Sequence, residues 1–325
     1  MVENFHSVYA EYLKQFISFK RKLGFKFKAE AFLLKKIDEA ALETNQSSSG
    51  ITKSFADIIR KKKPNEGWQY RQRRISVLAM FSSYLNDIGI DSYIPKVPPC
   101  KNKEYLPYIF SQNEINTIFN ECDQYKLIRR HPYNNLFIMP AFLRLLYATG
   151  IRFGEAINLK DTDVDLDDNY LLIKDSKNGK ERIIPISYSL SDVLKEYLWF
   201  RNYLPKNKNN YFFIGVSGNK CNQRIRVWFK KILERSNIQY LGKNKGPRVH
   251  DLRHTFAVNS LVKMVEAGLD LYVSLPILST YLGHQSIEST NRYVRLTSML
   301  FPDLMNDIDY SLIDVFPKFK NYEPN

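Results

Sequence analysis

The sequence has no run of apolar residues near the roughly 18 that a membrane-spanning helix needs. Its first residues carry charges inside the first apolar stretch, which is unlike a signal peptide. Only three cysteines occur, far apart, and they match neither a disulfide framework nor a metal-ligand spacing. Nucleotide-binding loops and internal repeats are also missing. We therefore expect a cytoplasmic protein with free thiols and no reason to use ATP.

Positive charge, in contrast, is abundant and uneven. The chain has 48 Lys and Arg against 34 Asp and Glu, a formal net charge of +14, and 44% of its residues are apolar. A globular protein this basic usually binds a polyanion, although a cationic surface can also serve solubility alone. Residues 1–100 carry 17 Lys and Arg against 10 Asp and Glu, whereas residues 302–325 carry 2 against 5. The basic front and the acidic end suggest different partners.

The length of 325 residues suits two domains rather than one. Residues 91–107 hold four prolines and no helical period, so they are predicted to be a linker. Apolar residues at spacings of three and four predict a four-helix domain before this linker. Its expected helices span 3–22, 29–43, 51–62 and 70–88.

The second half predicts a mixed domain. Strands are expected at 170–174 and 181–186, joined by a turn at 177–179, with a third strand near 161–166. Ser111 and Glu114 have the spacing of a capping box that starts the first helix. The fold class is therefore mainly α with a small antiparallel β-sheet. Further helices are expected at 111–123, 135–148, 153–159, 189–203, 222–236, 251–265, 274–282 and 286–295.

Four motifs in this half contain residues suited to phosphodiester chemistry. A tyrosine can attack phosphorus and keep the bond energy in a covalent intermediate. Arginine forks bind two phosphate oxygens and stay charged, and lysine or histidine can move the protons of the attacking and leaving oxygens. The motifs are 148–155 (ATGIRFGE), 177–182 (KNGKER), 250–257 (HDLRHTFA) and 282–293 (LGHQSIESTNRY).

The order and spacing of these motifs resemble those of the tyrosine site-specific recombinases, which include phage integrases and Xer-type recombinases. The resemblance covers about residues 106–298. It implies roles by position. Tyr293 would be the nucleophile, and Arg152 and Arg253 would clamp the scissile phosphate, braced by Glu155. Lys177 would protonate the leaving 5′-oxygen, with Lys180 as its rival. His250 would handle the tyrosine proton, and His284 would hydrogen-bond a phosphate oxygen.

The same resemblance implies the reaction and its setting. DNA would be cleaved and rejoined through a 3′-phosphotyrosyl bond, with no metal and no ATP, by four protomers on two duplexes with paired half-sites. We expect an integrase or transposase of a mobile element, associated with the nucleoid, and the family also allows an accessory recombinase or directionality protein. Alternatives are Xer-like chromosome dimer resolution and type IB topoisomerase activity. A non-enzymatic DNA-binding regulator is disfavoured, because such a protein has no need of Tyr293.

The domain predictions follow. Residues 1–90 form an all-helical core-DNA-binding domain, 91–107 a linker, 108–300 a mixed α/β catalytic domain, and 301–325 a tail that docks on a neighbouring protomer or on its own domain. Basic residues near the start of the fourth helix are expected to contact phosphate, or else to form a solvated charged face. These candidates are Lys61, Lys62, Arg71, Arg73 and Arg74.

Two patterns resemble metal sites but each lacks a necessary residue. Residues 250–254 (HDLRH) have aspartate where a zinc-hydrolase helix has its glutamate base. The aspartates of 161–165 lack the glycine and the bidentate glutamate of a calcium loop. We therefore expect no metal.

Overall fold

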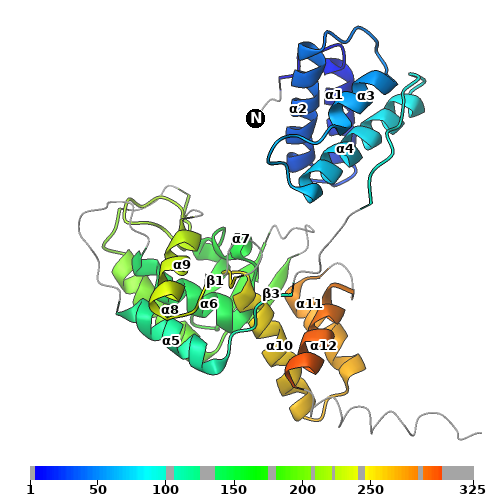
Figure 1. Cartoon of the computed structure of the whole chain (residues 1–325). Coiled ribbons are helices and arrows are strands. Elements are labelled where there is room, and N and C mark those ends of the chain that lie inside the picture. Colours follow the sequence, from blue (N-terminus) through cyan, green and yellow to red (C-terminus); the bar gives the residue numbers. More distant parts are fainter. Residues whose placement is uncertain are drawn as a thin grey trace, which may run out of the picture. The chain divides into compact units, whose positions relative to one another are not determined.

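The computed structural model describes residues 4–99, 106–124, 136–174, 181–205, 209–221, 224–240, 246–284 and 288–301. The chain divides into two compact units, 1–105 and 106–325, which are described separately (Figure 1). In the described part of the chain, no helix is both long enough and apolar enough to cross a membrane. The predicted turn at 177–179 and the predicted tail beyond Phe301 lie outside the described residues.

The described part of the first unit contains four helices, as predicted, but the first of them begins at Ala10 and not at residue 3. The last of them packs against the other three, and buried aromatic rings fill the space between them: Phe16 and Phe81 have ring centroids 5.7 Å apart. In the second helix the apolar residues Leu34 and Ile37 are buried, whereas Phe32 and Leu42, which are also apolar, are exposed. The helices are α1 (Ala10–Lys22), α2 (Lys28–Glu43), α3 (Lys53–Arg60) and α4 (Trp68–Asp87).

The basic residues of this unit differ in exposure. Lys61, Lys62 and Arg73 are exposed, and Arg73 pairs with Glu30. Arg71 is half-buried and donates from Nε to the Arg60 carbonyl oxygen at 3.0 Å. These four remain candidates for phosphate contact.

Arg74 is enclosed by the protein. Its guanidinium donates to both Glu66 carboxylate oxygens at 2.9 and 2.8 Å, and to the carbonyl oxygens of Ile59 and Lys61. Both side chains of the ion pair are 3% exposed. The expected phosphate contact of Arg74 is therefore corrected: its donors tie the end of α3 to α4, and its role is structural.

This buried pair predicts a large stability effect. Replacing Glu66 by Gln leaves the Arg74 charge without its partner, so we expect the free energy of unfolding to fall by about 3–5 kcal/mol. Urea unfolding of the full chain, followed by circular dichroism, measures the change. The control is Glu11→Gln, which removes an exposed pair with Lys14 and should change the value by less than about 0.5 kcal/mol. Equal effects of the two substitutions would contradict the structural role of Arg74.

The second unit carries a three-stranded antiparallel sheet in the order β1-β2-β3, with Leu171 opposite Ile184. The strands are β1 (Val164–Asp165), β2 (Tyr170–Ile173) and β3 (Arg182–Pro185), so the strand expected near 161–166 is only two residues long and follows a short 3-10 turn. The capping box of Ser111 and Glu114 is confirmed. The helices are α5 (Gln112–Asp123), η1 (Leu136–Ile138), α6 (Met139–Thr149), α7 (Phe153–Ala156), η2 (Asp161–Asp163), α8 (Tyr188–Arg201), α9 (Ile225–Arg235), α10 (Asp251–Glu266), α11 (Leu271–Leu282) and α12 (Glu288–Leu300).

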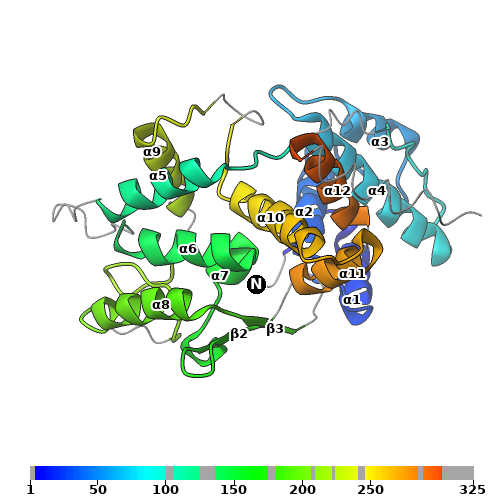
Figure 2. The same cartoon turned by 90° about the horizontal axis from the view of Figure 1, so that it is seen from below.

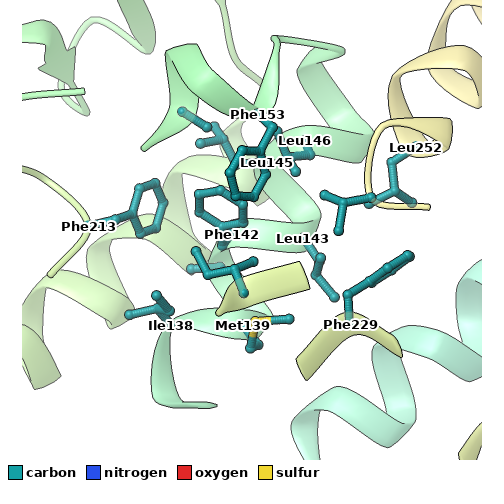
Figure 3. Close-up of a cluster of buried hydrophobic side chains, with 14 of the residues drawn as sticks. Ile138, Met139, Phe142, Leu143, Leu145, Leu146, Phe153, Phe213, Phe229 and Leu252 are labelled. Carbon is teal, nitrogen blue, oxygen red and sulfur yellow. The ribbon is translucent and has the colours of Figure 1, made fainter. Parts of the chain in front are cut away.

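Helix α6 lies at the centre of the main core, packed against α5, α8 and α10. Its Phe142 ring meets the rings of Phe153 and Phe213 edge to face (Figure 3). Figures 1 and 2 both show α10 between α6 on one side and the pair α11 and α12 on the other. Leu252 of α10 belongs to the main core, while Val258 and Leu261 belong to a second cluster with α11 and α12. Helix α10 carries the third motif and packs against the helices that carry the first and fourth motifs.

Candidate active site

The turn between α6 and α7 is built around a glycine. Gly150 ends α6 at φ +59°, and a Cβ at this position would lie 2.3 Å from Cδ1 of Phe256. Only glycine fits both the left-handed backbone and this close approach. The chain then turns sharply into α7, with Arg152 as its N-cap residue. The glycine of the first motif thus directs Arg152 toward the end of α11.

Three arginines from three parts of the chain meet three consecutive carbonyl oxygens at the C-terminal end of α11. Arg182 Nε donates to the Tyr281 oxygen at 2.9 Å, Arg253 Nη2 to the Leu282 oxygen at 2.8 Å, and Arg152 Nη2 to the Gly283 oxygen at 2.6 Å. The last carbonyl groups of a helix have no partner within the helix and carry partial negative charge, which cations stabilise. The end of α11 therefore positions both arginines that the sequence assigned to phosphate.

Glu155 holds two of these arginines from the other side. Its Oε1 accepts from Arg152 Nη1 at 2.8 Å, and its Oε2 accepts from Arg182 Nη2 at 2.8 Å and from the Arg152 backbone N–H at 2.9 Å. Burial alone would raise the pKa of this carboxyl, but the hydrogen bonds from Arg182 and the Arg152 backbone outweigh it and lower the pKa to about 2. Glu155 is thus a permanent anion, in the bracing position predicted for it.

Arg253 and His284 form a hydrogen-bonded chain with Thr290. Arg253 Nη2 lies 3.0 Å from His284 Nε2, and His284 Nδ1 lies 2.9 Å from the Thr290 hydroxyl. An arginine can only donate, so Nε2 accepts, and neutral His284 carries its proton on Nδ1 and donates it to Thr290. Burial and the charge of Arg253 lower the pKa of His284 to about 4, which keeps the ring neutral. Burial and Arg152 lower the pKa of Arg253 to about 10, so it remains a cation at neutral pH.

Tyr293 lies in the second cluster and is 2% exposed. Its hydroxyl is 3.1 Å from Nδ1 of His254, and its ring lies nearly parallel to that of His284 with centroids 6.1 Å apart. Burial raises the pKa of Tyr293, although Arg253 and Arg292 pull it down. The phenol is therefore protonated at neutral pH and hydrogen-bonded to a histidine.

His250 has a different environment from the one expected. His250 is an exposed residue at the N-cap position of α10, and its ring meets the ring of His254 edge to face, with centroids 4.8 Å apart. Desolvation by neighbouring atoms and the charges of Arg253 and Arg248 lower its pKa. Among the described residues, the histidine hydrogen-bonded to the Tyr293 hydroxyl is His254, so the proton role assigned to His250 remains a prediction.

The structure brings four of the six predicted residues into direct or near contact around the end of α11, with His250 beside them. These four are Arg152, Arg253, His284 and Tyr293, while Lys177 and its rival Lys180 lie outside the described residues. Sequence reasoning gave no role to Arg182 or His254. Arg182 lies in the motif KNGKER and His254 in HDLRHTFA. Their position within motifs whose other residues had been assigned roles is the sequence feature that could have identified them.

Comparisons with known proteins identify the family of this chain. The model described as "Phage integrase family" matches residues 109–299. The putative integrase/recombinase y4rB of Sinorhizobium fredii is 29% identical over 93% of this chain and 98% of its own length. The tyrosine recombinase XerA of Pyrococcus horikoshii is 29% identical over 71% of this chain and 72% of its own length.

Solved structures share the fold. The XerH recombinase, in a post-cleavage complex with palindromic difH substrate, is 20% identical and has a TM-score of 0.60, covering 85% of this chain and 78% of XerH. The Tn1549 transposon integrase, in complex with transposon right end DNA, is 15% identical and has a TM-score of 0.60, covering 91% of this chain and all of that structure's chain (100%). The match to the family model spans more than half of the sequence and contains all four motifs, and the chain belongs to the phage integrase family.

Proposed function

We propose that this protein is a site-specific DNA recombinase that cleaves and rejoins strands through a phosphotyrosyl bond at Tyr293. The observation that carries the proposal is the gathering of Arg152, Arg253 and His284 at the end of α11, with the Tyr293 ring stacked against His284. Two guanidinium forks at one point are suited to a phosphate. A phenol beside them is suited to attack it.

The residues divide the reaction between them. Arg152 uses two of its five N–H donors on Glu155 and Gly283 and keeps donors for a non-bridging phosphate oxygen. The Tyr293 oxygen attacks phosphorus, and the bond from phosphorus to the 5′-oxygen breaks. The predicted acid for this leaving oxygen is Lys177. His250 is exposed at the N-terminal end of α10, and its role in moving the proton of Tyr293 remains a prediction from the resemblance.

Metal and ATP independence belongs to the same proposal. The positive charge that stabilises the transition state comes from fixed arginines, which act without reorganisation. The phosphotyrosyl bond retains the energy of the broken phosphodiester, so rejoining needs no second energy source.

The partner is double-stranded DNA with paired half-sites. XerH and lambda integrase were solved on DNA, the latter as a dimer on its core site. In the first unit the exposed residues Lys61, Lys62 and Arg73 would contact the phosphate backbone. We propose that four copies of the chain assemble on two such sites. The protein would be encoded by a mobile element and act at the nucleoid, and an accessory recombinase or directionality protein would be specific to that element.

A covalent capture experiment tests the reaction. The full chain is mixed with a pool of duplexes of randomised sequence, each nicked once so that a short cleaved strand diffuses away, in buffer with excess EDTA and no nucleotide. Adducts are isolated under denaturing conditions and sequenced. We expect protein-linked DNA enriched in one paired-repeat sequence, at the same yield with and without EDTA. A yield that EDTA abolishes and magnesium or zinc restores would contradict the metal-independent mechanism.

A further inference from the structure

The hydroxyl of Tyr293 has a histidine partner that the motif roles leave unused. His254 lies one turn along α10 from His250, and its Nδ1 is 3.1 Å from the Tyr293 oxygen. The two rings come from residues 39 apart in sequence, and both side chains are buried. This is the geometry expected of a base and the nucleophile that it activates.

We propose that His254 is a further catalytic residue, which orients the Tyr293 hydroxyl through Nδ1 and accepts its proton during attack on DNA. The proposal rests on the function proposed above. In the forward step the bond from the tyrosine oxygen to phosphorus forms, the O–H bond breaks, and the proton moves to Nδ1. The bond to the 5′-oxygen breaks at the same time, and Lys177 supplies that oxygen with its proton. In the rejoining step Nδ1 returns the proton to the phenol.

The surroundings of His254 keep its ring neutral in the free protein. Burial, the neighbouring His250 ring and Arg292 lower the pKa of His254 to about 2, so the ring is neutral and can offer a lone pair to the phenol. The same cations oppose the imidazolium that forms during attack, so in the absence of DNA His254 is a weak base. An incoming phosphate brings negative charge that offsets the surrounding cations while the imidazolium exists. The charged and titratable groups that face the ring are His250 and Arg253 on α10, Arg248 before it, and Arg292 and Tyr293 on α12.

The arrangement also places the two histidines of this motif differently, whereas the sequence assigned the tyrosine proton to His250 alone. His250 is exposed, next to Arg152 and Arg253, where a bound phosphate would lie. His254 is buried behind it, on the side of Tyr293. The structure thus favours His250 for contact with DNA and His254 for the tyrosine proton.

The experiment makes the phenol of the nucleophile more acidic, so that its deprotonation depends less on a base. Fluorinated tyrosine has a more acidic phenol than tyrosine and needs less help from a base. Tyr293 is replaced by 2,3,5-trifluorotyrosine through codon reassignment in the wild-type chain, in His254→Asn and in His250→Asn. Adduct formation is measured on the nicked site recovered by covalent capture, and DNA binding is measured by gel shift for each protein.

We expect His254→Asn to bind DNA normally and to form adducts about 10²–10⁴-fold more slowly, the usual contribution of a general base. Trifluorotyrosine should restore most of this loss in His254→Asn and little of any loss in His250→Asn. Recovery confined to His250→Asn would assign the proton to His250 and overturn the proposal. So would wild-type rates in His254→Asn, or a slow rate that the acidic phenol leaves unchanged. A second variant, His254→Gln, repeats the test should the asparagine variant bind DNA poorly.

The two proposals fail in different ways. If the wild-type chain forms no adduct with any DNA of the pool, the proposed function fails, and the histidine comparison has no reaction to report. If the wild-type chain forms adducts that depend on Tyr293, the function stands, and the trifluorotyrosine result decides the role of His254 alone.

Discussion

Tyr293→Phe should bind the captured DNA site with unchanged affinity and form no covalent adduct. The substitution removes only the hydroxyl, and the ring keeps its place in the cluster of α10, α11 and α12. Without the hydroxyl that lies beside His254 there is no nucleophile, so the loss should be complete rather than partial. The nicked duplex, a denaturing gel and a gel shift measure the adduct and the binding.

The control is another tyrosine of the same unit. Tyr188 at the start of α8 is 81% exposed, and Tyr188→Phe should form adducts as the wild-type chain does. An adduct that survives in Tyr293→Phe would remove Tyr293 as the nucleophile and would direct the search to another hydroxyl. Loss of DNA binding in Tyr293→Phe would instead mean that the hydroxyl serves the packing of α12.

Much of the fold could be predicted because the relevant signals are local. Helical spacing identified the helices of both units, and the Ser111 and Glu114 spacing identified a helix start that the structure confirms. The exposed faces were harder to predict. Phe32 and Leu42 are apolar but exposed, because α2 turns the stripe of Leu34 and Ile37 toward its neighbours. Which of two apolar stripes is buried depends on partner helices that the sequence does not identify.

The candidate site was predicted through the order of its motifs, while its contacts were not. The Arg182 bond to Tyr281 joins residues 99 apart, and the Arg152 bond to Gly283 joins residues 131 apart. Nothing local indicates that three arginines share the end of one helix. The same holds for Arg74, which looked like a phosphate contact beside Arg71 and Arg73, and which burial next to Glu66 makes structural. Charge is visible in a sequence, but its burial is not.

The second large effect is expected at Glu155, whose carboxylate lies between Arg152 and Arg182. Glu155→Gln leaves two guanidinium groups in a buried region without their anion, so we expect the free energy of unfolding to fall by about 3–5 kcal/mol at pH 7. We also expect slower adduct formation, because Arg152 loses the group that orients its fork toward the phosphate. Urea unfolding and the nicked duplex measure the two effects on the same protein.

The control for this substitution is a surface pair in the same unit. Glu121 bonds to Arg235 at 3.0 Å, and the Arg235 side chain is about half exposed. Glu121→Gln should change the free energy of unfolding by no more than about 1 kcal/mol and should not affect adduct formation. A comparable loss in both variants would mean that removal of any negative charge from this basic chain is destabilising.

The pH dependence of Glu155 distinguishes a buried anion from a merely well-packed side chain. The pKa of Glu155 is about 2 in the folded chain and has an ordinary value of 4.5 for an unpaired glutamate. Because the folded value is the lower one, the carboxylate stabilises the fold fully above about pH 5, and this contribution, about 3 kcal/mol, is lost as the pH falls toward 2. The stability difference between the wild-type chain and Glu155→Gln should therefore be constant from pH 8 to about pH 5 and shrink below it. A difference that stays the same down to the lowest pH at which the chain still folds would show that Glu155 acts through its shape, and that Arg152 and Arg182 do not depend on its charge.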